Sequence, residues 1–321
     1  MEGKSEDVAK ALTGFFASAE KPILFAGAGV SMLAGLPDWS GLLNSMAEAI
    51  RAKDPLTANQ IKSYVAKGSL TRAADFFLIT DDVLEVDKFE ILKKLLKSYD
   101  SAPLKSLASL PFTGVITTNF DRSIFDALAA VREGHTANDY SLGEPKFIQA
   151  AFEQDLFVAR IHGAVDFPPS MVLSENQFKE LLKNDAYLDV LSESMLHRSI
   201  LFLGFSFYDP AIKFVMDRLE KRFGPALPNR HMALLPSSNA AELITKASRL
   251  NLSIVKYDPA NRHAALWQGV EQYAQKLNST TTRHVVSVSH PYAVTKQYLA
   301  ACYARANVAP AMVPLREIIF E

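Results

Sequence analysis

Residues 21–39 read KPILFAGAGVSMLAGLPDW, and this stretch decides the fold. The run Ile23–Ala26 is apolar at every position, as in a strand that is buried on both faces of a sheet. Gly27 and Gly29 follow at once, where glycine permits a tight turn and a close approach of the backbone to a phosphate group. The sequence therefore predicts a first strand that turns into a helix, with an anion-binding loop between them.

Further apolar runs of the same kind recur along the chain, and segments with helical periodicity separate them. Examples of these periodic segments are 123–131, 210–223 and 240–250. Alternation of buried strands with helices predicts an α/β fold, a doubly wound parallel sheet with helices on both faces. The predicted strands are Ile23–Ala26, Gly114–Thr117, Leu156–Ile161, Ile200–Gly204, Met232–Leu235 and Ile254–Tyr257.

One long interval, from about 41 to 111, contains no convincing strand. Within it, residues 86–99 place apolar side chains at three- and four-residue steps, which predicts an amphipathic helix. We therefore expect an inserted helical module over about 41–111, with 167–197 as a candidate addition to it. The main domain is expected over 1–278, followed by the polar linker Asn278–Thr282 and a short C-terminal extension over 279–321.

Composition excludes several classes of protein. Of the 321 residues, 49% are hydrophobic and 21% are charged, which argues against disorder and coiled coil. The formal charge of −1 gives no global attraction to nucleic acid or to an anionic membrane. The single cysteine, Cys302, excludes an internal disulfide and a zinc site of four cysteines. The N-terminal residues lack the apolar core of a signal peptide, so we expect a cytoplasmic protein without a membrane span.

The second predicted strand runs into residues 117–121, TTNFD. Asn119 follows the carboxyl end of a parallel strand, where open α/β sheets bind ligands, and its amide can hold a ribose hydroxyl or an attacking water. An equally good interpretation is that Asn119 or Asp121 caps the helix that begins near Arg122, which is worth about 1 kcal/mol. The motif alone leaves both interpretations open.

The third predicted strand ends in RIHG, residues 160–163. His162 is placed to face the same crevice, and its ordinary pKa of about 6.5 suits a general base at neutral pH. The alternative is a structural histidine, and we give that interpretation to the others, which form no metal-ligand spacing with a neighbouring Cys or His. They are His135, His197, His231, His263, His284 and His290.

Two further strand ends carry candidate binding residues. After the fourth strand, Gly204 allows a close backbone approach, and Ser206 offers a hydroxyl and an N–H to a ribose or phosphate. Asp209 followed by Pro210 is a typical helix start, so we interpret both as structural. Tyr257 ends the sixth strand, where its ring either stacks on a purine or packs locally.

In this order along one chain, the motifs resemble those of the sirtuin family, and within it the bacterial sirtuin-like NAD hydrolases of antiviral defence. The matching text is GAGVSMLAGLPDW at 27–39, TTNFD at 117–121, RIHG at 160–163 and LFLGFSFYDP at 201–210. The resemblance extends over about residues 20–275. It implies a Rossmann-like large domain, a helical small domain, and NAD bound between them.

The resemblance also implies roles for individual residues. Asn119 and His162 would be the catalytic pair. The expected NAD-binding residues are Gly27, Ala28, Gly29, Ser31, Asp38, Trp39, Thr118, Asp121, Gly204, Phe205, Ser206 and Tyr257.

Departures from the protein-deacylating sirtuins are informative. Those enzymes carry two Cys-x-x-Cys pairs for a structural zinc, which a chain with only Cys302 cannot supply. They also have an arginine shortly after the Pro-Asp of the glycine loop, where this chain has Trp39 and Ser40, and a glutamine at the position of Thr118. We therefore expect hydrolysis of NAD to nicotinamide and ADP-ribose. The alternatives are an NAD-dependent protein deacylase, and a non-catalytic NAD or ADP-ribose sensor or assembly scaffold.

Regulation is expected, because unrestrained NAD hydrolysis would kill the cell that makes the protein. We expect NAD as the substrate, no metal, and a role in antiphage defence. Activation would come through homo-oligomerisation or through a separate partner such as a DNA-translocating ATPase. We expect that such a partner, rather than this near-neutral chain, contacts any nucleic acid.

Overall fold

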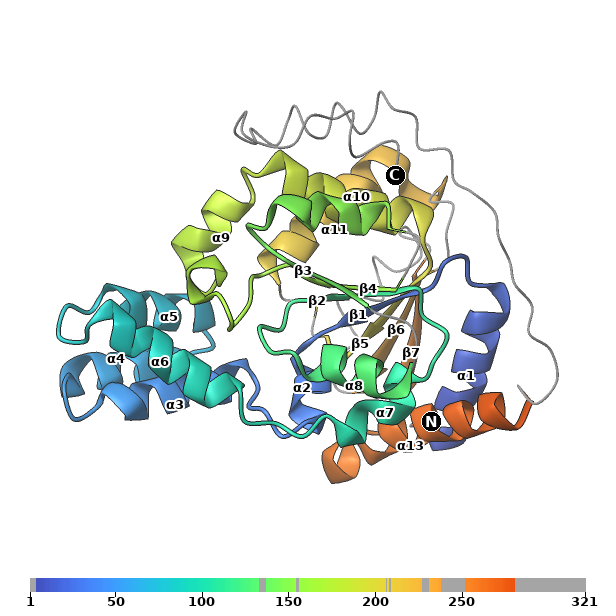
Figure 1. Cartoon of the computed structure of the whole chain (residues 1–321), viewed down its shortest axis with the longest axis horizontal. Helices are drawn as coiled ribbons and strands as arrows, with labels where there is room; N and C mark the ends of the chain where they lie inside the picture. Colours follow the sequence, from blue (N-terminus) through green and yellow to red (C-terminus); the bar gives the residue numbers. More distant parts are fainter. Residues whose placement is uncertain are drawn as a thin grey trace.

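A computed structural model of the chain describes residues 4–132, 137–153, 156–205, 207, 209–226, 231–237 and 252–280. Its centre is a seven-stranded sheet in the order β3-β4-β2-β1-β5-β6-β7, with every neighbouring pair parallel (Figure 1). The strands are β1 Ile23–Ala26, β2 Gly114–Thr117, β3 Asn138–Ser141, β4 Phe157–Arg160, β5 Ile200–Leu203, β6 His231–Pro236 and β7 Leu252–Tyr257. This arrangement confirms the predicted doubly wound α/β fold.

The strand order reverses at β1. From β1 the chain continues to β2 on one side, and β5 joins β1 on the other side before β6 and β7 extend the sheet outward. Ligands of open α/β sheets bind outside the carboxyl ends of the strands at such a switch point. The fold therefore points to the loops that follow β1, β2, β4 and β5.

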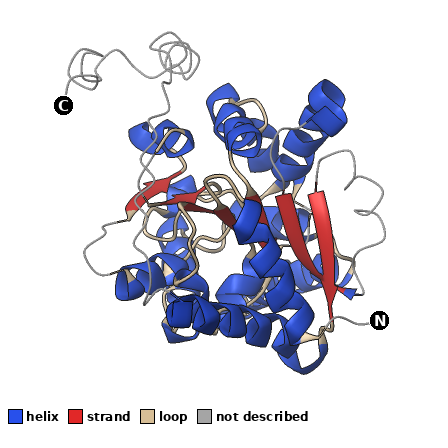
Figure 2. Ribbon diagram, turned by 90° about the vertical axis from the view of Figure 1, so that its right-hand side faces the viewer, coloured by secondary structure: helices blue, strands red, loops and turns tan. Residues whose placement is uncertain are grey.

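Helices cover both faces of the sheet (Figures 1 and 2). On one face lie α1 Ser5–Ser18, α2 Ala28–Leu33, α7 Lys105–Ala108, α8 Ser123–Val131 and α13 Ala260–Thr280. On the other face lie α10 Asp185–His197 and α11 Pro210–Phe223, with α9 Glu175–Leu181 beside them. Short 3-10 helices connect these elements at Ala102–Leu104, Pro145–Ala151, Pro168–Ser170 and Gly224–Ala226.

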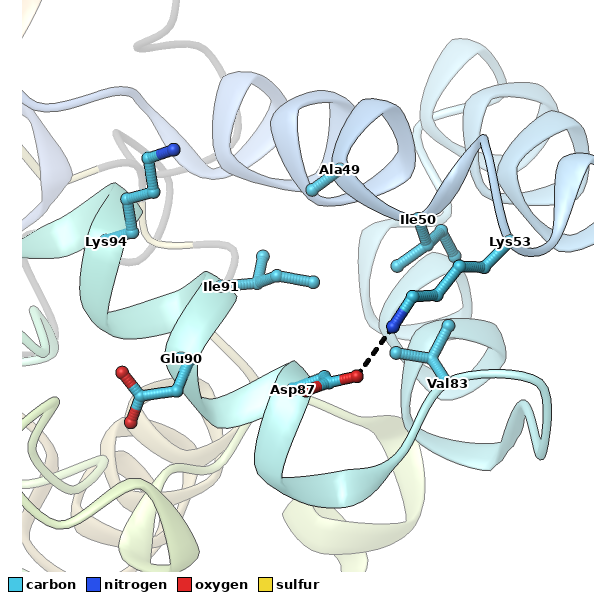
Figure 3. A pocket seen from close by; sticks show the side chains of 8 residues that line it. All are labelled: Ala49, Ile50, Lys53, Val83, Asp87, Glu90, Ile91 and Lys94. Atoms are coloured by element: carbon cyan, nitrogen blue, oxygen red, sulfur yellow. Dashed lines mark hydrogen bonds and ion pairs between the residues drawn. The ribbon is translucent and has the colours of Figure 1, made fainter.

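The interval between β1 and β2 forms a helical module beside the sheet (Figure 1). It consists of α3 Trp39–Ile50, α4 Pro55–Ala66, α5 Leu70–Ile79 and α6 Glu85–Leu96, which share an apolar cluster of their own. The expected amphipathic helix is α6. A cavity of about 330 Å³ lies between α3 and α6, where Lys53 Nζ contacts Asp87 Oδ2 at 2.7 Å (Figure 3). The boundary predicted for the module stays a prediction.

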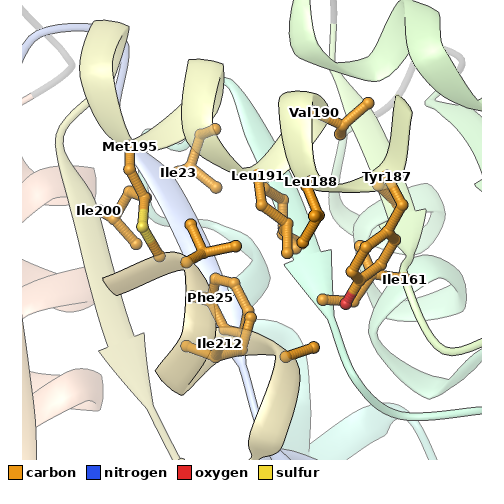
Figure 4. Packing of buried hydrophobic residues seen from close by; sticks show 14 of the residues in the cluster. Ile23, Phe25, Ile161, Tyr187, Leu188, Val190, Leu191, Met195, Ile200 and Ile212 are labelled. Atoms are coloured by element: carbon orange, nitrogen blue, oxygen red, sulfur yellow. The ribbon is translucent and has the colours of Figure 1, made fainter. Parts of the chain in front are cut away.

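One large apolar cluster fixes α10 and α11 on the sheet (Figure 4). Ile23, Phe25 and Ile200 project from the central strands, and Tyr187 and Leu191 of α10 pack onto them. Close packing of this kind makes the position of α10 sensitive to changes of one methylene group. Of the candidate addition 167–197, α10 thus packs with the sheet, whereas α9 contacts α5 of the helical module.

Sequence periodicity missed β3, because this edge strand is polar rather than apolar. Its Asp139 accepts from Arg160 of β4 at 2.9 Å and from Arg122 at 2.8 Å. Part of the expected linker was wrong, since α13 continues to Thr280 and so includes its first three residues. The predicted helix over 240–250 and the extension from 281 onward lie outside the described residues.

Candidate active site

The parallel register brings the motifs of the sequence to one edge of the sheet. The last paired residues of the four central strands are Ala26, Thr117, Arg160 and Leu203. Gly27 and Gly204 follow their strands by one residue, and Asn119 and His162 follow theirs by two. The glycine loop, the asparagine, the histidine and the second glycine therefore follow the carboxyl ends of four adjacent strands.

The glycines allow two loops of the protein to touch. The N–H groups of Gly27 and Gly29 donate to the carbonyl oxygens of Leu203 and Gly204, both at 3.0 Å. A Cβ atom at Gly27 would lie 2.4 Å from the Gly204 oxygen, and Gly204 itself has a φ of +65°. The expected reason for these glycines was approach to a phosphate. In the structure, the absence of side chains at these glycines allows the loop after β5 to lie against the loop after β1. Ala28, between Gly27 and Gly29, is half-buried.

Asn119 is held against the glycine loop. Its Nδ2 donates to the Gly27 carbonyl at 2.9 Å, and its backbone N–H donates to Thr117 Oγ1 at 3.0 Å. The Thr117 hydroxyl donates in turn to the Ala26 carbonyl at 2.9 Å. Since Nδ2 is engaged, Oδ1 is the atom of the amide that can accept a hydrogen bond from a ligand. These bonds explain the position of Asn119, so the helix-capping role that the sequence also allowed for Asn119 is not needed.

His162 is buried at the end of the neighbouring strand, with 3% of its surface exposed. Its ring meets Phe178 of α9 edge to face, with centroids 5.1 Å apart, and its Nε2 lies 3.5 Å from Asp209 Oδ2. Burial lowers the pKa of His162, and the negative charge of Asp209 opposes that change. The imidazole is therefore neutral at pH 7 and able to accept a proton.

Asp209 has a second partner that the sequence analysis missed. It caps α11, as predicted, because Oδ1 accepts the N–H groups of Ala211 and Ile212, both at 3.0 Å. Its other oxygen is the one that faces His162. An aspartate that caps a helix directly after a central strand uses one oxygen for the cap, and its second oxygen can interact with a residue of a neighbouring strand end. This pattern in the sequence could have indicated the second partner.

Ser31 and Asp121 form a buried pair beneath the loops. Ser31 Oγ donates to Asp121 Oδ2 at 2.6 Å, and Asp121 Oδ1 accepts the backbone N–H of Ser123 at 2.9 Å. Both oxygens of Asp121 thus have protein donors, and only 3% of the residue is exposed. These contacts favour the capping interpretation of Asp121 and tie α2 to the start of α8.

Three predicted binding residues lie where the helical module meets the sheet. Asp38 caps α3, with Oδ1 accepting the Gly41 N–H at 2.6 Å. The half-buried Trp39 ring lies 6.3 Å from the ring of Phe120, next to Asn119. Thr118 is also half-buried, and its N–H donates to the Ala26 carbonyl at 3.4 Å. Trp39 and Thr118 therefore lie beside the segment that carries Asn119, where the helical module meets the sheet.

Other predicted residues are not brought to this cluster. Phe205 is buried in the core, where its ring lies 5.1 Å from that of Phe25. Tyr257 ends β7, three strands from β1, and its hydroxyl lies 3.1 Å from His263 Nδ1. Only 3% of Tyr257 is exposed, which fits local packing rather than stacking on a purine. Ser206 lies outside the described residues.

Part of the chain is similar to a known family. Residues 113–255, which include β2, Asn119, His162 and β5, match the family model described as SIR2-like domain. This finding confirms the resemblance to sirtuins that the motifs indicated.

Curated relatives are similar to this chain over more than half of its length. The chain is 28% identical over 210 residues to NAD(+) hydrolase ThsA of Bacillus cereus (strain MSX-D12), which covers 64% of this chain and 41% of that protein. It is 25% identical over 209 residues to NAD(+) hydrolase ThsA of Cytobacillus dafuensis, covering 63% of this chain and 38% of that protein. The chain thus spans about two fifths of the length of the curated relatives it matches.

The described residues contain neither a metal-ligand cluster nor a membrane-spanning helix. In those ranges, no group of three or more His, Cys, Asp or Glu is arranged to hold a metal ion. No helix within the described part of the chain is long and apolar enough to cross a bilayer.

Proposed function

We propose that this protein hydrolyses NAD to nicotinamide and ADP-ribose. The observation that carries the proposal is the bond of Asn119 Nδ2 to the Gly27 carbonyl. It joins the loop after β1 to the loop after β2, and β2 pairs with β4, the strand that His162 follows by two residues. The relatives named NAD(+) hydrolase ThsA support the same activity.

The residues around Asn119 suit the binding of a dinucleotide. The half-buried loop at 28–29 and the Ser31 region form the wall against which the pyrophosphate would lie. Trp39 and Thr118 would border the ribose on the side of the helical module. Gly27, Gly29 and Gly204 would contribute by shaping this wall, because their backbones fix the two loops against each other. Binding roles for Asp38, Asp121, Phe205, Ser206 and Tyr257 stay predictions without supporting contacts.

The reaction needs one proton acceptor and a correctly placed water. Asn119 Oδ1 would accept a hydrogen bond from the water or from a ribose hydroxyl near C1′. As the bond between C1′ and the nicotinamide nitrogen breaks, its electron pair neutralises the pyridinium, and nicotinamide leaves uncharged. The ribose then resembles an oxocarbenium ion, as in other glycosidic cleavages. Water adds to C1′, and His162 takes its proton.

Release of nicotinamide tests this proposal. Wild type, Asn119→Ala and a matched surface control, Asn176→Ala on α9, are incubated with NAD, and NAD binding is measured in parallel. We expect Asn119→Ala to lower turnover by about 10²-fold or more, because the water loses its hydrogen-bond acceptor, and Asn176→Ala to leave it unchanged. Full turnover by Asn119→Ala would contradict the assignment.

The same assay separates the alternatives. NAD bound by the wild type without release of nicotinamide, under every activating condition tried, would favour a sensor or scaffold. Release of O-acetyl-ADP-ribose from an acylated peptide would favour a deacylase.

In the cell, we propose that the protein acts in the cytoplasm as an NAD-depleting effector of antiphage defence. The activity named for the relatives and the expected need for restraint support this role. Activation would come from homo-oligomerisation or from a separate partner such as a DNA-translocating ATPase. Mass measurement in solution beside NAD turnover, with and without the candidate partner, tests this, and a constantly active monomer would contradict it.

A further inference from the structure

We propose that Asp209 is a positioning residue for His162, and that it holds the imidazole with its proton on Nε2 so that Nδ1 is the nitrogen that accepts the proton. The proposal rests on the proposed NAD hydrolysis and extends it by one residue. Sequence reasoning gave Asp209 only the task of capping a helix.

The position of the Asp209 carboxylate is fixed by the fold. Asp209 lies between β5 and α11, and its Oδ1 accepts two N–H groups of the first turn of α11. The helix dipole favours a negative charge at this end of α11. The other oxygen, Oδ2, lies 3.5 Å from His162 Nε2, close enough for an electrostatic interaction although Nε2 makes no hydrogen bond among the described residues, and 12% of the Asp209 side chain is exposed.

The surroundings of the pair are nearly dry. His162 meets the Phe178 ring from α9, and Tyr187 of α10, which lies within the field of the Asp209 carboxylate, has 1% of its surface exposed. Figure 4 shows the Tyr187 ring directed from α10 toward the sheet, and its hydroxyl has no hydrogen-bond partner among the described residues. Burial, together with the negative charge of Asp209, raises the pKa of Tyr187, so this hydroxyl stays protonated.

In the described part of the chain, the charge that acts on the histidine is that of Asp209. Asp209 comes from the start of α11, the apolar Phe178 ring comes from α9, and the neutral Tyr187 hydroxyl of α10 lies within the field of the same Asp209 carboxylate. A carboxylate attracts an N–H and repels the lone pair of an unprotonated nitrogen, so the nitrogen beside it is favoured as the protonated one. Burial alone would lower the pKa of His162, and Asp209 restores part of the basicity that proton transfer needs.

In the reaction, the pair would act as follows. Nδ1 takes the proton that leaves water as the oxygen adds to C1′, and Nε2 keeps the proton it already holds. The imidazolium that results carries a positive charge, which the Asp209 carboxylate balances across 3.5 Å. The proton passes to solvent after product release, and Asp209 acts only through His162.

The test reads the histidine directly and does not depend on turnover. Full-length protein labelled with ¹⁵N only at its 7 histidines gives separate ring-nitrogen signals, and His162→Gln identifies those of His162. We expect Nε2 of His162 to carry the proton in wild type and the shifts to change in Asp209→Asn. Asparagine caps helices as well as aspartate does, so this variant keeps α11 and removes the charge. The matched control is Asp54→Asn, at the buried N-cap of α4, where Oδ1 accepts the Thr57 N–H at 2.9 Å.

Kinetics provide the second readout. Asp209→Asn should lower turnover by about 10²-fold and move the acidic limb of the pH–rate profile to lower pH, because His162 then loses its proton at lower pH. Asp54→Asn should change neither. A His162 whose Nε2 is unprotonated in wild type, or whose shifts are the same in Asp209→Asn, would overturn the proposal even if NAD is hydrolysed. If instead the shifts change but wild type releases no nicotinamide, the pairing stands and the proposed function fails.

Discussion

Two buried histidines occupy opposite ends of the sheet. His162 follows the carboxyl end of β4 and His231 begins β6 at its amino end, with 3% and 5% of their surfaces exposed. Burial lowers the pKa of both. They differ in their partners, because His162 Nε2 faces the Asp209 carboxylate, whereas His231 Nδ1 accepts the backbone N–H of Ile200 at 3.2 Å. Burial is thus shared, and only the surroundings distinguish a candidate base from a structural residue.

The comparison extends to the two ends of the sheet as a whole. At the amino end, polar side chains serve the main chain: Arg198 Nη2 donates to the Glu153 carbonyl at 2.6 Å, and Ser199 Oγ accepts the Glu20 N–H at 3.0 Å. At the carboxyl end, Asn119 and Asp209 each use one polar atom for the main chain and have another left. The candidate functional residues are therefore side chains that one polar atom holds in place, while a second polar atom remains available to a ligand or to a neighbouring side chain.

The largest expected effect separates the two histidines by activity. His162→Gln should lower NAD hydrolysis by about 10²- to 10⁴-fold, because glutamine keeps hydrogen-bonding ability but cannot act as a base at neutral pH. His231→Gln should keep the turnover of the wild type, because its partner is the Ile200 backbone of the distant amino end. Initial rates of nicotinamide release at one saturating NAD concentration measure both.

Circular dichroism and thermal melting control this experiment for folding. Equal loss of activity in the two folded variants would remove the distinction between the ends of the sheet. Equal retention would remove His162 from the mechanism.

A smaller but still large effect concerns the contact of the two loops. Gly204→Ala should destabilise the protein by about 3 to 5 kcal/mol, because a φ of +65° is unfavourable for alanine and its Cβ would lie 2.7 Å from the Val30 nitrogen. The control is Gly224→Ala at the end of α11, where φ is +49° and no atom lies within 4 Å of an added Cβ. It should cost about 1 to 2 kcal/mol. Urea unfolding measures the loss of stability in both variants. Similar losses would show that the two loops can move apart at little cost in free energy.

Sequence reasoning succeeded where periodicity and strand order decide the outcome. Ile23–Ala26 and Gly114–Thr117 agree with β1 and β2 at both ends, since a strand buried on both faces must be apolar throughout. The rule that parallel strands end at one edge then sufficed to gather Asn119 and His162. Polar β3 was missed because its stability comes from ion pairs of Asp139 with residues far along the chain.

The sequence did not predict the contacts that the motifs make with one another. Gly27 and Gly204 each suggested a close approach to a ligand, but nothing in either motif says that the two approach each other. Tyr257 ended a predicted strand as Asn119 did, and only the strand order shows that it lies three strands from β1. The second partner of Asp209 depends in the same way on the distance between neighbouring strand ends.

A third effect gives His231 its own signature in the pH dependence of stability. Burial lowers the pKa of His231 to about 4, against about 6.5 in the unfolded chain. Below pH 6.5 the unfolded state takes up a proton that the folded state refuses until about pH 4, so stability falls as the pH is lowered through this window. The loss from this residue amounts to about 3 kcal/mol at pH 4.

Urea unfolding of wild type and His231→Gln at pH 7, 5.5 and 4 measures that contribution. Glutamine does not titrate, so the stability of the variant should decline less with acid, by about 3 kcal/mol over the series. Parallel declines in the two proteins would show that His231 is hydrated or protonated in the folded state.

The smallest expected effect concerns Asp38. It tests whether Asp38 belongs to the NAD-binding residues at the carboxyl end of the sheet or only caps α3. Its Oδ1 accepts the Gly41 N–H at the start of α3, so Asp38→Ala should cost about 1 kcal/mol of stability while Asp38→Asn should cost little. If capping is its whole task, KM for NAD should be the same in Asp38→Asn as in wild type, because asparagine holds α3 and Trp39 in place. A raised KM in Asp38→Asn with unchanged stability would instead place Asp38 among the residues that bind NAD. Asp38 would then resemble Asn119, with one polar atom of the side chain holding the fold and the other available to the ligand.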